Sequence, residues 1–278
     1  MRPRSQSAPA SADVTPALAS LLERRASACR LTPDRALQSL DEAEVFLAER
    51  GMLTLTPDCT LPSLFGACHE EPYRPGGHGF ATWPRTKYIW HFELSARPDV
   101  HILKIHRGKT LYLSAHTLAL VDPLCRTELA HAEAGEYGPA ATRLVEYLDA
   151  AGPSLVEDVK RELGLDTAAL RRLRQRLESA GVLVSRAVAV PAATGTERET
   201  SELARWDQRF AVPQSAAATA PEAALDDLVV AGVRAAIVAP REEVGAWFSW
   251  PLALSQLDQL VAEGRLSQPQ DGWIAVGE

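Results

Sequence analysis

The chain is poor in cysteine and has no long apolar run. Its 278 residues include four cysteines without CxxC spacing, so neither a zinc ribbon nor a secreted disulfide scaffold is indicated and we expect free thiols. No stretch of about 18 apolar residues is present, and the first fifteen residues lack the apolar core of a signal peptide. We therefore expect a cytoplasmic protein with a disordered N-terminus over residues 1–14.

Signature motifs of several enzyme classes are also absent. No P-loop, dinucleotide fingerprint or nucleophile elbow occurs, and the glycine-rich stretch 76–79 lacks the strand–helix context of a phosphate-binding loop. The seven histidines form no HxH or HxxxH pair, and His101 and His106 are predicted to point to opposite faces of one strand because their separation is odd. We accordingly predict no cofactor, no metal and no membrane partner.

Charge is unevenly distributed along the chain. The formal net charge of −7 argues against a protein that coats nucleic acid indiscriminately, since such binding depends on neutralising phosphates with Lys and Arg. Residues 74–126, however, contain eight basic and three acidic side chains, a local net charge of +5 that leaves −12 for the rest. This segment is therefore where contact with an acidic partner is expected.

The N-terminal third predicts a first compact unit. Apolar residues recur with helical spacing over 15–27 and 33–50, and Gly51 ends the second of these helices. The alternation that follows over 52–57 predicts a short strand. Helix, glycine and strand together predict a first winged-helix-like unit over 15–66.

Residues 67–137 combine aromatic side chains with a basic hairpin. Alternating stretches at 100–106 and 110–114 flank the tip 107–109, where Gly108 supplies the positive φ that a tight turn requires. Most of the aromatic side chains are expected to pack in a core, while Trp83 is the candidate for stacking on a nucleic-acid base.

Residues 138–190 predict a winged helix. Helical spacing over 140–150, 154–163 and 167–180 is followed by a strand at 182–190, and this order of helix, helix, turn, helix and strand is typical of the module.

The remaining residues predict a linker and a third module. Residues 191–220 are rich in Ala, Thr, Pro and Glu, which indicates a linker, and helix and strand signals return over 221–278 as a third winged helix. We therefore predict an α+β fold, predominantly α, built from tandem winged-helix (helix-turn-helix) modules with a central basic β-hairpin.

The basic residues of the hairpin region and of the helix at 167–180 are the candidates for DNA contact. A winged helix commonly places its third helix in the major groove, and a basic β-ribbon can grip the backbone. A solvated polar surface is the competing interpretation. The third module has no Lys or Arg on its last helix, which favours a structural or protein-binding role there. The candidates are Arg85, Lys87, Lys104, Arg107, Lys109, Arg171, Arg172, Arg174 and Arg176.

Five stretches, taken in their order along most of the chain, carry a family resemblance. They are 36–68, Thr82-Trp-Pro-Arg-Thr-Lys87, Arg107-Gly-Lys-Thr-Leu111, 140–190 and Phe248-Ser-Trp-Pro251. Their order resembles the bacterial AlkZ-related proteins, winged-helix relatives of the AlkZ-type DNA glycosylases that excise alkylated or crosslinked bases. The resemblance implies a protein that binds double-stranded DNA and acts in DNA repair.

The sequence departs from the catalytic pattern of that family. The glycosylases position water with a glutamine, a hydrophobic residue and then an aspartate or glutamine early in the chain, whereas Gln38 and Asp41 stand at a different spacing. The related proteins are also expected to have a tryptophan–lysine–acid stretch, but no acid follows Lys87 in this sequence. If glycosidic cleavage takes place, Glu70 and Glu93 are the candidate carboxylates, since the reaction needs a group that orients water. The interpretation competing for these two residues is surface solvation.

Three functions are thus carried forward. The first is a DNA-binding winged-helix protein related to repair, and the second is an active DNA glycosylase for alkylated bases. The third is a transcriptional regulator or interaction protein whose winged helices bind protein, for which DNA affinity should be absent even at low salt. The oligomeric state is left open by these patterns.

Overall fold

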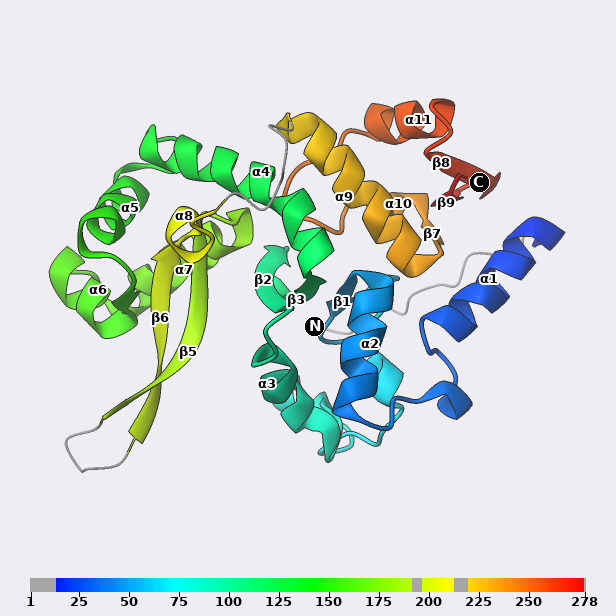
Figure 1. Cartoon of the computed structure of the whole chain (residues 1–278), viewed down its shortest axis with the longest axis horizontal. Helices are drawn as coiled ribbons and strands as arrows, with labels where there is room; N and C mark the ends of the chain where they lie inside the picture. The colour runs from blue at the N-terminus through cyan, green and yellow to red at the C-terminus, as the bar shows by residue number, and fades with distance from the viewer. Residues whose placement is uncertain (1–13, 192–196, 213–219, 278) are drawn as a thin grey trace.

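The computed structural model describes residues 14–191, 197–212 and 220–277, so the disorder predicted for 1–14 falls, except for Val14, outside the described residues. Figure 1 shows an extended molecule with helix α4 (Ala115–Glu133) crossing its middle. Three small antiparallel sheets, each of three strands, lie around this helix. The α+β, mainly α-helical fold class is confirmed.

The first sheet contains the predicted hairpin. Strand β3 (Lys109–Ser114) lies between β1 (Met52–Thr54) and β2 (Val100–His106). The strand of the predicted first unit therefore pairs with the hairpin of the segment predicted to follow it. The other elements here are α2 (Leu40–Arg50), α3 (Trp90–Ser95) and the 3-10 helices η1 (Pro33–Arg35), η2 (Gly66–Cys68), η3 (Gly79–Thr82) and η4 (Lys87–Ile89).

Helix α2 begins later than predicted. The spacing from residue 33 onward indicated one helix, but 33–35 form η1 and the α-helix starts at Leu40. Ser39 explains the boundary, because its side chain accepts a hydrogen bond from the backbone N–H of Glu42 as an N-cap. The predicted end is confirmed, with Gly51 at φ +80° closing the helix.

The second sheet has the order β4–β6–β5 and forms one end of the molecule (Figure 1). Asp166 caps its third helix, accepting a hydrogen bond from the N–H of Ala169. The elements are α5 (Pro139–Ala151), β4 (Ser154–Leu155), α6 (Val156–Leu163), α7 (Thr167–Ala180), β5 (Leu183–Pro191), β6 (Glu197–Arg205) and α8 (Trp206–Arg209).

The described part of the segment 191–220 is more regular than a linker. It supplies strand β6, which pairs with β5 along its whole length, and helix α8. The sequence signal was weak because the two strands form a long ribbon whose outer part is exposed on both faces, so its polar residues do not alternate with apolar ones. Cross-strand charge supports the pairing, with Arg186 joined to Glu202 at 2.8 Å.

The third sheet has the order β7–β9–β8, and the first helix of the chain packs on it. Leu18 of α1 (Pro16–Ala28) is buried against Val238 and Ala275, so the helix predicted to belong to the first unit lies on the C-terminal one. The elements are α9 (Pro221–Ala236), β7 (Val238–Pro240), α10 (Arg241–Val244), α11 (Leu254–Ala262), β8 (Leu266–Gln270) and β9 (Trp273–Val276).

One buried cluster reaches from the first sheet to the third through α4. Within it, Trp206 is fully buried and donates its indole N–H to the Asp122 carboxylate at 2.6 Å. Arg126 pairs with the same carboxylate at 3.0 Å and donates to the carbonyl of Phe210. Asp122 thereby holds α8 against α4. No helix in the described part of the chain is both long and apolar enough to traverse a bilayer.

We expect Asp122→Ala to lower the free energy of unfolding by about 3 kcal/mol, because it leaves the Trp206 N–H and the Arg126 guanidinium without their shared acceptor. Urea denaturation measures the change, with the exposed Glu136→Ala as control, for which about 0.5 kcal/mol or less is expected. Equal midpoints for the two variants would contradict this role.

Candidate nucleic-acid interface

Two of the predicted DNA contacts are engaged by a buried carboxylate. Glu178 of α7 has a side chain that is only 2% exposed, and it accepts from Lys104 Nζ at 2.6 Å and from Arg174 Nε at 2.8 Å. Ser185 donates a third hydrogen bond to the same carboxylate. The network joins β2, α7 and β5. It neutralises the positive charges of Lys104 and Arg174, which the sequence alone would assign to the surface.

Three further basic candidates also have partners within the protein. Lys87 donates from Nζ to the carbonyl oxygens of Leu37 at 2.6 Å and Cys68 at 3.4 Å. Lys109 pairs with Asp58. Arg176 donates to the Tyr137 carbonyl at 3.1 Å, and its guanidinium lies over the Tyr137 ring. Each of these side chains is partly committed to holding the fold.

The other four candidates are exposed. Arg85, Arg107, Arg171 and Arg172 have no side-chain hydrogen bond or ion pair with any residue in the described ranges. Arg171 and Arg172 lie on the first turns of α7, and Arg107 lies at the hairpin tip with φ +53°. Among the candidates, these four guanidinium groups are the ones available to an anionic partner. The backbone of each residue is held in a helix or a turn, while the guanidinium group itself has no hydrogen bond or ion pair in the described ranges.

The hairpin is anchored where β2 meets helix α7 and the loop before α11. The Ile105 carbonyl accepts from the backbone N–H of Ser249 at 2.9 Å and from its hydroxyl at 3.0 Å. The Ser249 hydroxyl also lies 2.8 Å from that of Ser179 on α7. A hollow of about 480 Å³ opens at this junction, lined by Arg107, Ser179, Gly245, Phe248, Ser249, Trp250 and Pro251.

Trp83, the candidate for base stacking, is half-buried among other rings. Its ring centroid lies 4.8 Å from that of Phe80 and 5.2 Å from that of Phe65. The same side chain lines a hollow of about 460 Å³ beneath the hairpin, together with Asp58, His106 and Lys109. One part of the ring is therefore packed while another borders space that a planar ligand can enter.

The two candidate carboxylates do not line this hollow. Glu70 accepts hydrogen bonds from the N–H groups of Thr86 and Lys87 and from the Thr86 hydroxyl. Burial alone would raise the pKa of Glu70, but these bonds outweigh it and lower the pKa below its usual value, so the group is an ionised cap. Glu93 is exposed on α3. The carboxylate at the hollow is Asp58, which sequence reasoning missed because it follows β1 in an irregular loop.

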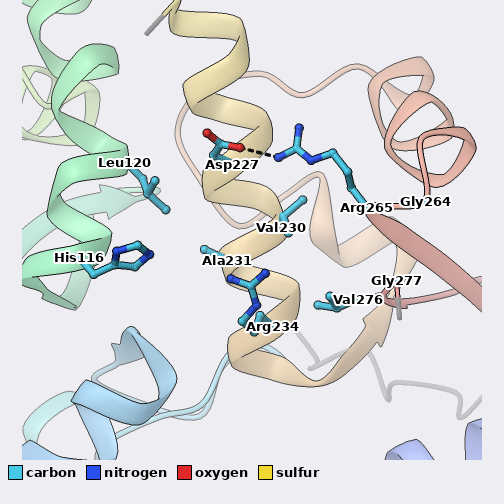
Figure 2. A pocket seen from close by; sticks show the side chains of 10 residues that line it. All are labelled: His116, Leu120, Asp227, Val230, Ala231, Arg234, Gly264, Arg265, Val276 and Gly277. Atoms are coloured by element: carbon cyan, nitrogen blue, oxygen red, sulfur yellow. Dashed lines mark hydrogen bonds and ion pairs between the residues drawn. The ribbon is translucent and has the colours of Figure 1, made fainter. Parts of the chain in front are cut away.

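Another hollow, of about 380 Å³, lies between α4, α9 and the C-terminal strands (Figure 2). His116 and Leu120 point into it from α4, while Asp227 of α9 pairs with Arg265 (Figure 2). Arg234 is exposed at its rim. Because Asp227 neutralises one of the two arginines, this hollow has less unpaired positive charge than the exposed residues of α7 and the hairpin tip.

Comparison with known proteins gives one structural likeness. No family model and no curated protein matches the chain. Among solved structures, the chain is similar to the DNA glycosylase AlkZ of Streptomyces sahachiroi, with 14% identity and a TM-score of 0.53. The superposition covers 92% of this chain and 68% of that one. A distant structural relationship to AlkZ, which the resemblance in the sequence predicts, is confirmed at the level of the fold.

We expect Lys104→Ala to lower the free energy of unfolding by about 2 kcal/mol, because the buried Glu178 carboxylate then keeps only Arg174 and Ser185 as partners. Arg107→Ala removes an equal charge from the same hairpin but should change stability by about 0.5 kcal/mol or less. Thermal and urea unfolding of both variants check this difference, and equal stability would assign Lys104 to the surface instead.

Proposed function

We propose that the chain is built from three winged-helix modules and binds double-stranded DNA through the first two, as a protein of the DNA-repair type. Support comes from a repeated chain order. Each sheet is formed by a short strand, then helices, then a hairpin whose last strand lies in the middle of the sheet. A first helix, a short strand, one or more further helices and a two-stranded wing, in this order, characterise the winged helix.

Helix α7 carries the proposal. It is the third helix of the second module, and in this class of fold the N-terminal residues of that helix approach the base edges of the major groove. Arg171 and Arg172 lie in the second turn of α7, exposed and without a salt bridge in the described ranges, although the charge of Arg172 acts on the nearby Asp166 carboxylate. Arg174 and Arg176, later in the helix, are engaged by Glu178 and Tyr137. The first two arginines are therefore the proposed groove contacts.

Arg107 and Arg85 are the proposed backbone contacts of the first module. The hairpin tip corresponds to a wing, and its anchored position lets Arg107 meet a phosphate without the cost of ordering a loop. Helix α11 of the third module contains no Lys or Arg, so we assign that module to holding the hairpin. The fold shared with AlkZ supports this function because that protein is a DNA glycosylase.

We expect the Arg171→Ala/Arg172→Ala variant to bind a short duplex more weakly, and the Arg85→Ala/Arg107→Ala variant to bind it more weakly with a salt dependence reduced by about 0.9 for each phosphate that is no longer neutralised. The matched control is Arg161→Ala, which removes an exposed arginine that already pairs with Asp158 on α6. Fluorescence anisotropy across a salt series measures both quantities. Absence of duplex binding by the unaltered protein at about 50 mM salt would overturn the proposal and favour a protein partner.

The hollow beneath the hairpin favours DNA glycosylase activity as a second candidate function. A glycosylase draws a base from the stack, holds it against a ring and orients water with a carboxylate. Trp83 and Asp58 both line this hollow and supply the ring and the carboxylate. Glu70 is committed as a cap and Glu93 does not line the hollow, so we assign the role to Asp58 in their place.

For this second candidate, Asp58→Asn should abolish excision of an alkylated base from a duplex, whereas Glu70→Gln and Glu93→Gln should retain it. Release of the free base, followed by strand cleavage at the abasic site, provides the measurement. Full activity in Asp58→Asn would remove this carboxylate from the mechanism, and no activity in the unaltered protein would leave DNA binding as the function.

A further inference from the structure

Asp58, Cys59 and His106 bring three different metal-ligating groups together. The His106 Nε2 atom lies 3.8 Å from Asp58 Oδ1 and 3.9 Å from Cys59 Sγ, and all three ligand atoms lie within 4.8 Å of one another. A tetrahedral Zn²⁺ with ordinary bond lengths separates such atoms by about 3.3–3.6 Å. The two shorter separations exceed this range by only a few tenths of an ångström.

His106 is oriented as metal-binding histidines usually are. The residue is only 4% exposed, and its Nδ1 faces the carbonyl oxygen of Trp247 at hydrogen-bond distance. A carbonyl can only accept, so Nδ1 carries the proton and Nε2 presents its lone pair to Asp58 and Cys59. Burial is the largest influence on this imidazole and lowers its pKa, which keeps the ring neutral. Hydrogen bonding of the second ring nitrogen to a carbonyl is the usual outer-shell support of a metal ligand.

The loop that carries Asp58 and Cys59 is fixed on both sides. The N–H of Thr60 donates to Glu243 of α10 at 2.6 Å, and Arg25 of α1 donates to the Thr60 carbonyl at 2.8 Å. Lys109 pairs with Oδ2 of Asp58, whereas Oδ1 faces His106. One carboxylate oxygen thus stays directed at the imidazole, and the ammonium group binds the other.

We propose that Asp58 Oδ1, Cys59 Sγ and His106 Nε2 bind one Zn²⁺ ion, with a water molecule as the fourth ligand. A hollow of about 790 Å³ that borders Asp58 and Cys59 gives solvent access to this fourth position. Three protein ligands and one water form the coordination set of an open zinc site. The sequence predicted no metal because it contains no paired histidines, and these ligands come instead from a loop and a strand.

Binding must remove the proton from Cys59. Burial raises the pKa of this thiol to about 12, so the free protein holds it protonated, and the metal displaces that proton into solution as the Zn–S bond forms. Cys68 provides a matched comparison, because burial raises its pKa to about 12 as well. Its sulfur, however, donates to the Leu64 carbonyl and belongs to no group of potential ligands among the described residues.

The test uses the full chain, stripped with a chelator and titrated with Zn²⁺ and, separately, with Co²⁺. We expect one equivalent of Zn²⁺ to bind, and Co²⁺ to give a thiolate-to-metal charge-transfer band. Cys59→Ser should lose this band and weaken Zn²⁺ binding about 100-fold, and Asp58→Asn should weaken it about 10-fold or more. Cys68→Ser should retain both the band and the affinity.

Failure to bind Zn²⁺, or unchanged binding in both Cys59→Ser and Asp58→Asn, would overturn the site. Circular dichroism of each stripped variant establishes that it is folded, so loss of metal binding is not confused with loss of structure. The zinc site is tested apart from DNA binding, since the titration is carried out without nucleic acid and the salt series is carried out without added metal. It excludes the glycosylase role given to Asp58 above, because Zn²⁺ and Lys109 together engage both oxygens of that carboxylate.

Discussion

Helix α4 is the constraint on which the rest of the structure depends. Its 19 residues include eight that are buried, and it packs against the first sheet, against α5 and α8 of the second unit and against α9 of the third. A helix buried on several sides must be apolar around most of its circumference, and the one buried polar group facing α8, Asp122, therefore needs the partners it has. Residues from all three sheets contribute to one shared cluster, beside which the described residues form two smaller ones.

Burial of acidic groups decides which basic residues remain for function. Glu178 and Asp122 each draw an arginine toward the interior, and Glu178 also engages the hairpin lysine Lys104. An unpaired buried carboxylate costs roughly several kcal/mol, so these pairs are maintained whatever the ligand. The positive charge counted along the sequence is therefore larger than the charge presented to a partner, because a few basic residues are neutralised by these buried carboxylates.

Local sequence signals predicted most of the helices and the β-hairpin, but not which sheet each element packs on. Asp166, Gly51 and Gly108 act through their own caps and turn, so their effects could be read from adjacent residues. The packing of α1 on the third sheet depends on contacts between residues more than two hundred positions apart, for which no local pattern exists. Strand β6 was missed because a two-sided exposed ribbon has no apolar alternation.

The candidate site was less predictable than the fold for a related reason. The sequence identifies Lys104 and Arg107 as equivalent basic residues of one hairpin, and only the distant Glu178 distinguishes them. Likewise His106 and Cys59 are 47 residues apart and come together through the register of β2 and the loop after β1. Pairings between side chains from separate elements are set by tertiary packing, which no window of sequence contains.

The two hydrogen bonds from Ser249 to the Ile105 carbonyl join residues 144 positions apart and fix the hairpin against the C-terminal unit. A double helix bound by the first two modules, as proposed, would meet a surface that does not adjust its own shape. The elastic work of matching that surface would then fall on the nucleic acid, and steps that kink or unstack easily, such as pyrimidine–purine steps, would be bound in preference to stiff ones. Under the proposed function, selectivity for deformable DNA would in this way add to that of the groove contacts of Arg171 and Arg172.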